Sequence, residues 1–210
     1  MKSDTSEGQF AGYYDLFFNP VLNRVHKKII FLAKKYDCEN IIDLGCGTGQ
    51  QARALSTNGF SVTGVDASRN MIAVAKEKSD PSITFIHETI QAVSLDVNSF
   101  DTANLSLVLH PNPERIIHGI IKKTIQLVKN NGIIFITDYG HGTGFSGRFA
   151  NGLIQIIESF AGQNHRNNYF SFRRNRGLEL ISTHPPLQII ERCFYFHGAL
   201  QTIVFRLLKD

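Results

Sequence analysis

The segment IIDLGCGTG, residues 41–49, places an acid directly before three glycines at alternate positions. A glycine-rich turn between a strand and a helix usually binds phosphate through backbone N–H groups, and the helix N-terminus adds positive potential. The carboxylate of Asp43 would oppose such an anion by roughly 4 kcal/mol at 4 Å for an effective dielectric near 20. The sequence therefore predicts a ligand that does not place a phosphate at this loop.

A second acid, Asp66, ends the apolar segment FSVTGVD, 21 positions after Gly45 (66 minus 45). A carboxylate at this distance can accept hydrogen bonds from a ribose diol. The dinucleotide pattern G-x-G-x-x-G would need a glycine at position 50, where this chain has Gln50. S-adenosylmethionine also has a ribose, but it carries an ammonium and a sulfonium in place of pyrophosphate. Asp43 would attract this ligand, so a nicotinamide-dependent oxidoreductase is the less favoured alternative.

Length and composition favour one compact domain over residues 1–210, because 42% hydrophobic residues can build one substantial core. The net charge of +4 comes from 22 basic and 18 acidic residues, a balance that does not indicate a nucleic-acid partner. Cys38, Cys46 and Cys193 show no paired metal spacing, so we expect no metal site and a reducing, cytoplasmic location. We also expect no integral membrane segment, since no run approaches about 20 apolar residues.

Strand-like and helix-like segments alternate along the chain. The expected strands are 40–44, 60–66, 83–87, 102–109 and 133–139. The expected helices are 20–36, 50–58, 69–78 and 113–130, the third capped by Ser68 and the last ended by Asn131 and Gly132. Beyond a loop at 140–147, we expect a helical piece at 153–160 and two strands within 188–209. This order predicts an α/β fold: a doubly wound, seven-stranded sheet, mostly parallel, with a closing antiparallel strand.

Three motifs resemble those of the class I S-adenosylmethionine-dependent methyltransferases of small-molecule type: DLGCGTG at 43–49, GVDAS at 64–68 and NSFDTANLSLVLH at 98–110. The resemblance implies a Rossmann-like fold, methyltransferase activity and S-adenosyl-L-methionine as cofactor. Thr89 stands where the family often has an acid that contacts the adenine, and Glu88 is the alternative. The cofactor-binding residues that the resemblance implies are Asp43, Gly45, Cys46, Gly47, Asp66, Ala67, Thr89, Ile90, Leu105 and Tyr14.

Four residues are candidate bases because of their positions. His110 and His141 follow the fourth and fifth expected strands, Tyr139 ends the fifth, and Tyr14 lies ahead of the first helix. Methyl transfer to a neutral amine needs no base, whereas a phenol or a carbon acid must lose a proton. The sequence leaves both classes of acceptor open.

The segments outside the expected parallel core are candidates for binding the acceptor. By resemblance, residues 1–36 form an N-terminal lid and helix, and residues 140–185 form a cover on the acceptor side. The cover is rich in glycine and aromatic residues, which suits an aromatic, quinone-like or amphiphilic small molecule. In the alternative interpretation, these aromatic residues only complete the core. A catalytically silent, S-adenosylmethionine-binding regulatory subunit is the other function that the motifs allow.

Overall fold

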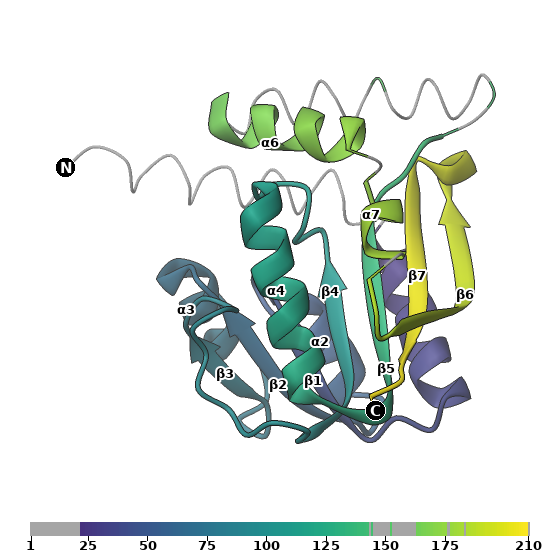
Figure 1. Ribbon diagram of the computed structural model, residues 1–210. Coiled ribbons are helices and arrows are strands. Elements are labelled where there is room, and N and C mark those ends of the chain that lie inside the picture. The colour runs from purple at the N-terminus through teal and green to yellow at the C-terminus, as the bar shows by residue number, and fades with distance from the viewer. Residues whose placement is uncertain are drawn as a thin grey trace.

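The computed structural model of the chain (Figure 1) describes residues 22–142, 144, 152, 163–175, 177–182 and 184–209. Tyr14 and the expected helical piece at 153–160 lie outside these residues. Within them, one sheet forms the centre of the molecule, and helices cover both of its faces.

Seven strands hydrogen-bond in the order β3-β2-β1-β4-β5-β7-β6. Neighbouring strands are parallel except at β7, which runs antiparallel to both β5 and β6. The prediction of a mostly parallel sheet with a closing antiparallel strand is confirmed. The bounds are β1 Asn40–Leu44, β2 Ser61–Asp66, β3 Thr84–His87, β4 Phe100–Ser106, β5 Val128–Tyr139, β6 Leu187–Tyr195 and β7 Leu200–Leu207.

Apolar residues on the two faces of the sheet form two separate core clusters. Ile41 belongs to the cluster under the helix at 22–35, α2 and α3, whereas Ile42 belongs to the cluster under α4 and α7. Successive residues of a strand point to opposite faces, which explains this division. The bounds are α2 Gln50–Ser56, α3 Arg69–Glu77, α4 Glu114–Leu127, α6 Gln163–Arg174, α7 Glu179–Ser182 and a 3₁₀ turn at Phe196–Gly198.

Helix α6 lies across the carboxyl ends of the central strands, above β4 and β5 in Figure 1. It contributes Phe172 to one core cluster and Tyr169 to the other. A helix that covers the edge of a sheet can reach the cores on both faces, which explains this double contact. The sequence analysis did not predict α6.

Two expected element boundaries are wrong. Helix α4 ends at Leu127, and the chain enters β5 at once, because Val128 already pairs with Phe100 of β4. Asn131 and Gly132 do not end the helix, and they lie instead in a bulge of β5 where Asn131 has a φ of 62°. Strand β4 runs from Phe100 to Ser106 rather than from 102 to 109, because Leu107 adopts a φ of 59° and turns the chain out of the sheet.

Gly64 in β2 allows a close approach between the sheet and the side chains above it. A Cβ atom at this position would lie 2.7 Å from Cδ1 of Phe85 and 2.9 Å from Sγ of Cys46. Phe85 comes from the neighbouring strand β3, and Cys46 comes from the glycine-rich loop. The absent side chain at position 64 thus lets the loop pack directly on β2.

We expect Gly64→Ala to lower the free energy of unfolding by about 1–3 kcal/mol, because the added methyl overpacks this contact. Gly119→Ala in α4 is the matched control, since its Cβ would meet only the side chain of Gln91, at 3.1 Å from Cγ. That change should raise the free energy of unfolding by about 0.5–1 kcal/mol, because alanine favours the helix more than glycine does. Urea unfolding followed by circular dichroism measures both, and an unchanged stability of Gly64→Ala would contradict the tight contact.

Candidate active site

The order of the strands reverses between β1 and β4, which lie side by side in the sheet. In open α/β sheets, ligands bind outside the carboxyl ends of the strands at such a reversal. Asp43 near the end of β1 is the register partner of Asn104 in β4. Leu105, the next residue of β4, is fully buried and lies one position before the end of the strand.

Asp43 is a buried carboxylate that is only partly hydrogen-bonded. Its side chain is held by Asn104, whose Nδ2 donates to Oδ1 at 2.7 Å, and the residue is 2% exposed. Oδ2 of Asp43 and Oδ1 of Asn104 are buried and have no hydrogen-bond partner among the described residues. Burial raises the pKa of Asp43 to about 6, although the bond from Asn104 lowers it, and the charge of Asp66 adds to the rise. A cationic hydrogen-bond donor would satisfy both of these oxygens.

The glycine-rich loop passes close to the segment that follows β4. Gly45 has a φ of 77°, and a Cβ there would lie 2.4 Å from Cγ2 of Val108. Gly47 and Gly49 also have positive φ values, of 52° and 75°, so the loop uses a backbone conformation that other residues rarely adopt. Cys46 is buried, and burial raises the pKa of its thiol well above the usual range. A neutral thiol is a poor nucleophile, so Cys46 fills space in this loop.

Asp66 holds the glycine-rich loop beside the start of α3. Its Oδ2 accepts a hydrogen bond from the Gly47 N–H at 2.8 Å, and its Oδ1 accepts one from the Ser68 N–H at 2.8 Å. Ser68 in turn caps α3 by accepting a hydrogen bond from the Met71 N–H, as the sequence predicted. Each carboxylate oxygen has two lone pairs, so Asp66 keeps the capacity to accept a ribose diol.

The residues expected around an adenine lie beside the carboxyl ends of β2 and β3. Ala67 and Thr89 are exposed, and Ile90 is buried. Glu88 bends back onto the chain, because its Oε1 accepts a hydrogen bond from the Thr89 N–H at 2.8 Å. His87, which the sequence analysis did not single out, places Nε2 3.1 Å from the carbonyl oxygen of Ala67. Contacts of these residues with a ligand remain predictions.

A buried histidine and a buried aspartate meet at the ends of β4 and β5. Nδ1 of His110 lies 2.8 Å from Oδ1 of Asp138. Oδ2 of Asp138 also accepts the N–H groups of Leu109 at 3.0 Å and His110 at 3.2 Å, and Oδ1 accepts that of Tyr139 at 2.7 Å. The sequence analysis missed Asp138. Its signal was an acid near the end of an apolar strand, the same signal that helped to identify Asp66.

Aromatic rings surround His110. Its ring centroid lies 4.6 Å from that of Tyr139, 5.4 Å from that of His165 and 6.2 Å from that of Tyr169. His165 and Tyr169 belong to α6, so this helix covers the histidine and the aspartate beneath it. His110 is consequently only 1% exposed.

The structure brings together two of the four candidate bases, His110 and Tyr139. His141 is exposed just beyond β5, and Tyr14 lies outside the described residues. In the described part of the chain, no group of three or more histidine, cysteine, aspartate or glutamate residues could hold a metal ion. No helix in that part has the length and apolar character needed to cross a membrane.

Residues 41–132 match the family model described as a methyltransferase domain. Over this segment, which is less than half of the chain, the sequence is similar to methyltransferase domains. A ubiquinone biosynthesis O-methyltransferase from Coxiella burnetii is 33% identical over 124 residues, which are 57% of this chain and 50% of that relative. The relative of the same description from Pelagibacter ubique is 34% identical over 129 residues, which are 57% of this chain and 52% of the relative. The chain thus spans about half the length of these curated relatives.

Solved methyltransferase structures share the fold. The plantazolicin methyltransferase BpumL, crystallised with S-adenosylhomocysteine, superimposes with a TM-score of 0.69 over 98% of this chain and 92% of that one, at 14% identity. A 1,6-didemethyltoxoflavin-N1-methyltransferase from Burkholderia thailandensis superimposes with a TM-score of 0.63 over 96% of this chain and 85% of that one, at 11% identity. At these identities, the likeness establishes the architecture of this chain.

We expect the affinity for S-adenosylhomocysteine to fall as the pH drops through about 6, the pKa of Asp43. Below that pH the free protein carries a proton on Asp43, and the ligand ammonium must displace it, so affinity decreases by up to about tenfold per pH unit. Above pH 7 the affinity should be constant. Calorimetric titration from pH 5 to 8 measures this change.

Asp43→Asn should bind more weakly and lose this pH dependence, because its amide does not titrate. Among the described residues, the other groups that face Asp43 are Asn104, Asp66 and Cys46. A pH dependence that survives in Asp43→Asn would assign the titration to another group and would remove Asp43 from this role.

Proposed function

We propose that this chain binds S-adenosylmethionine and transfers its methyl group to a small-molecule acceptor. The observation that carries the proposal is the buried, partly satisfied carboxylate of Asp43 beside the glycine-rich loop, at the reversal of the strand order. A phosphate ligand would be repelled there, whereas an ammonium would be attracted. The shared fold and the family motifs support the same ligand.

The residues of the crevice fit the parts of this cofactor. Asp43 and Asn104 would accept hydrogen bonds from the ammonium through their unsatisfied oxygens. Asp66 would accept the ribose hydroxyls, and the backbone at Gly45 and Gly47 would lie against the methionine end. The proposed contacts with the cofactor are completed by five further residues: Ala67, Thr89, Ile90, Leu105 and Tyr14.

S-adenosylmethionine supplies a methyl carbon bound to a positively charged sulfur. The protein contributes position and the exclusion of water, because an in-line transfer needs both reactants held in one geometry. Helix α6 covers the carboxyl ends of β4 and β5 and can exclude water there. We propose that residues 1–210 form one domain in which 1–36 act as a lid and 140–185 cover the acceptor.

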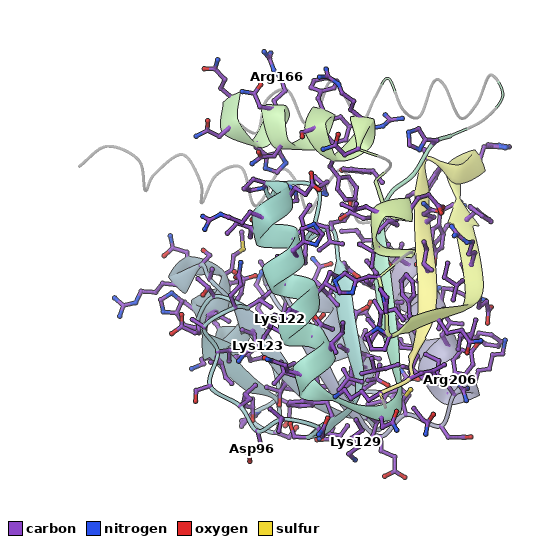
Figure 2. The ribbon with its side chains drawn as sticks, in the orientation of Figure 1. Asp96, Lys122, Lys123, Lys129, Arg166 and Arg206 are labelled. Carbon is purple, nitrogen blue, oxygen red and sulfur yellow. The ribbon has the colours of Figure 1, made fainter. Side chains whose placement is uncertain are left out.

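We propose an aromatic, quinone-like or amphiphilic acceptor. The described part of the cover supports this, because Tyr169 of α6 is buried and its ring centroid lies 6.2 Å from that of His110. The names of the relatives point the same way, although they describe only those proteins. Figure 2 shows basic residues spread over the molecule, with Arg166 on α6 and Lys129 near the opposite end, which does not favour a nucleic-acid acceptor. The three cysteines are free thiols, which supports a cytoplasmic location.

We expect calorimetric titration to show binding of S-adenosylmethionine and S-adenosylhomocysteine, and no binding of NAD. Asp66→Ala should weaken both interactions by roughly ten- to a hundredfold, because a charged hydrogen-bond acceptor is worth about 1.5–3 kcal/mol. Asp96→Ala is the matched control, since Asp96 lies at the opposite end of the molecule from α6 (Figure 2).

NAD binding without S-adenosylhomocysteine binding would contradict the proposal. Transfer of a labelled methyl group into a metabolite extract tests the enzymatic part separately. Cofactor binding with no transfer to any small molecule would instead favour the silent regulatory subunit.

A further inference from the structure

We propose that His110 is the general base of the transfer, that Asp138 positions it, and that the acceptor atom is a hydroxyl oxygen, phenolic in class. This inference rests on the proposed methyl transfer and adds the chemistry of its acceptor. It depends on the buried contact between His110 and Asp138 and on where that contact lies relative to the glycine-rich loop.

The contact fixes which ring nitrogen of His110 carries the hydrogen. Asp138 accepts hydrogen bonds from the N–H groups of Leu109, His110 and Tyr139, in addition to its contact with the ring. An ionised carboxylate can only accept hydrogen bonds. Nδ1 of His110 therefore donates to Asp138, and Nε2 of the neutral ring is the atom that can take a proton.

The segment that carries His110 packs against the glycine-rich loop, which would lie at the methionine end of the cofactor. Leu107 has a φ of 59°, which is uncommon for a bulky residue, and its N–H is held by the Thr137 carbonyl at 2.8 Å. The turn brings Val108 against Gly45 of the glycine-rich loop, and His110 follows two residues later. The strained residue thus connects the proposed base to the loop that would hold the methyl donor.

Helix α6 encloses the base. Nδ2 of Asn168 donates to the carbonyl oxygen of Pro111 at 2.8 Å, which attaches the helix to the segment that carries His110. His165 and Tyr169 of α6 pack around the ring, and Arg173 donates to the hydroxyl oxygen of Tyr169 at 2.9 Å. Since His110 is 1% exposed, an acceptor reaches Nε2 only when the side chains that cover the ring shift, those of α6 among them.

A base beside the acceptor indicates a hydroxyl group, because a hydroxyl must lose its proton during the transfer. Nε2 of His110 takes the hydroxyl proton, and the oxygen lone pair forms the new bond to the methyl carbon. The electrons of the broken carbon–sulfur bond stay on sulfur, and His110 later releases the proton to solvent. A neutral amine attacks through its own lone pair without losing a proton first, so it would not require this pair.

The first test examines the free protein and involves no turnover. Long-range ¹H–¹⁵N correlation of ¹⁵N-labelled protein reports which nitrogen of each histidine is protonated, and His110→Gln assigns the signal. We expect hydrogen on Nδ1 and none on Nε2, and we expect Asp138→Asn to abolish this preference. A neutral His110 with its hydrogen on Nε2 would overturn the proposal.

The second test compares two acceptors at saturating S-adenosylmethionine, 4-octylcatechol and 4-octylthiophenol. His110→Gln and Asp138→Asn should lower kcat for the catechol by about 10²–10⁴-fold and remove the acid limb of its pH profile. In the same two variants, kcat for transfer to the thiol should change less than tenfold. An aromatic thiol is largely ionised at pH 8, so it does not need a base. His118→Gln is the control, since His118 is an exposed histidine on α4.

The titration of Asp43 changes the affinity for the cofactor. At saturating cofactor it therefore does not contribute to the acid limb of the kcat profile. Among the described residues, the titratable or charged groups around His110 are Asp138, Tyr139, His165, Tyr169 and, through Tyr169, Arg173. Binding of S-adenosylhomocysteine by both variants within about twofold of wild type would preserve the proposed function. If kcat for the catechol were unchanged in both variants, the role of His110 as general base would be refuted. Transfer to 4-octylaniline instead of the catechol would refute it as well. Either result would leave the proposed methyl transfer standing.

Discussion

The burial of one carboxylate, that of Asp43, is the constraint on which the site depends. Removing an ionised carboxylate from water is costly unless hydrogen bonds or a cation compensate. Asn104 supplies one hydrogen bond from the neighbouring strand at the same register, and Oδ2 has no partner among the described residues. The fold thus keeps a polar group ready for a cationic ligand at the point where the strand order reverses.

Acids near the ends of strands also determine where the loops lie. Asp66 accepts backbone N–H groups from Gly47 and Ser68, and so connects the loop after β1 to the start of α3. Asp138 accepts N–H groups from the segment after β4 and so connects it to β5. Both carboxylates use hydrogen bonds to backbone N–H groups to hold these loops, in addition to the packing of Cys46 and Leu109.

The acceptor side is built differently, from elements added to the parallel core. Helix α6 has a polar sequence with only Tyr169 and Phe172 buried, and it reaches the cores on both faces of the sheet. A helix attached by few side chains can shift at a smaller free-energy cost than a strand inside the sheet. Families that share a core vary their substrates through such additions.

The sequence by itself determined the parallel sheet, the Ser68 cap and the acids Asp43 and Asp66, because periodicity and glycine spacing act over a few residues. It could not decide whether Asn131 ends a helix or forms a bulge, since both structures use a positive φ. Only the tertiary structure joined His110 to Asp138, 28 positions apart. The physical reason is that β4 and β5 are parallel neighbours, so residues beyond one strand meet residues at the end of the other only after the sheet has formed.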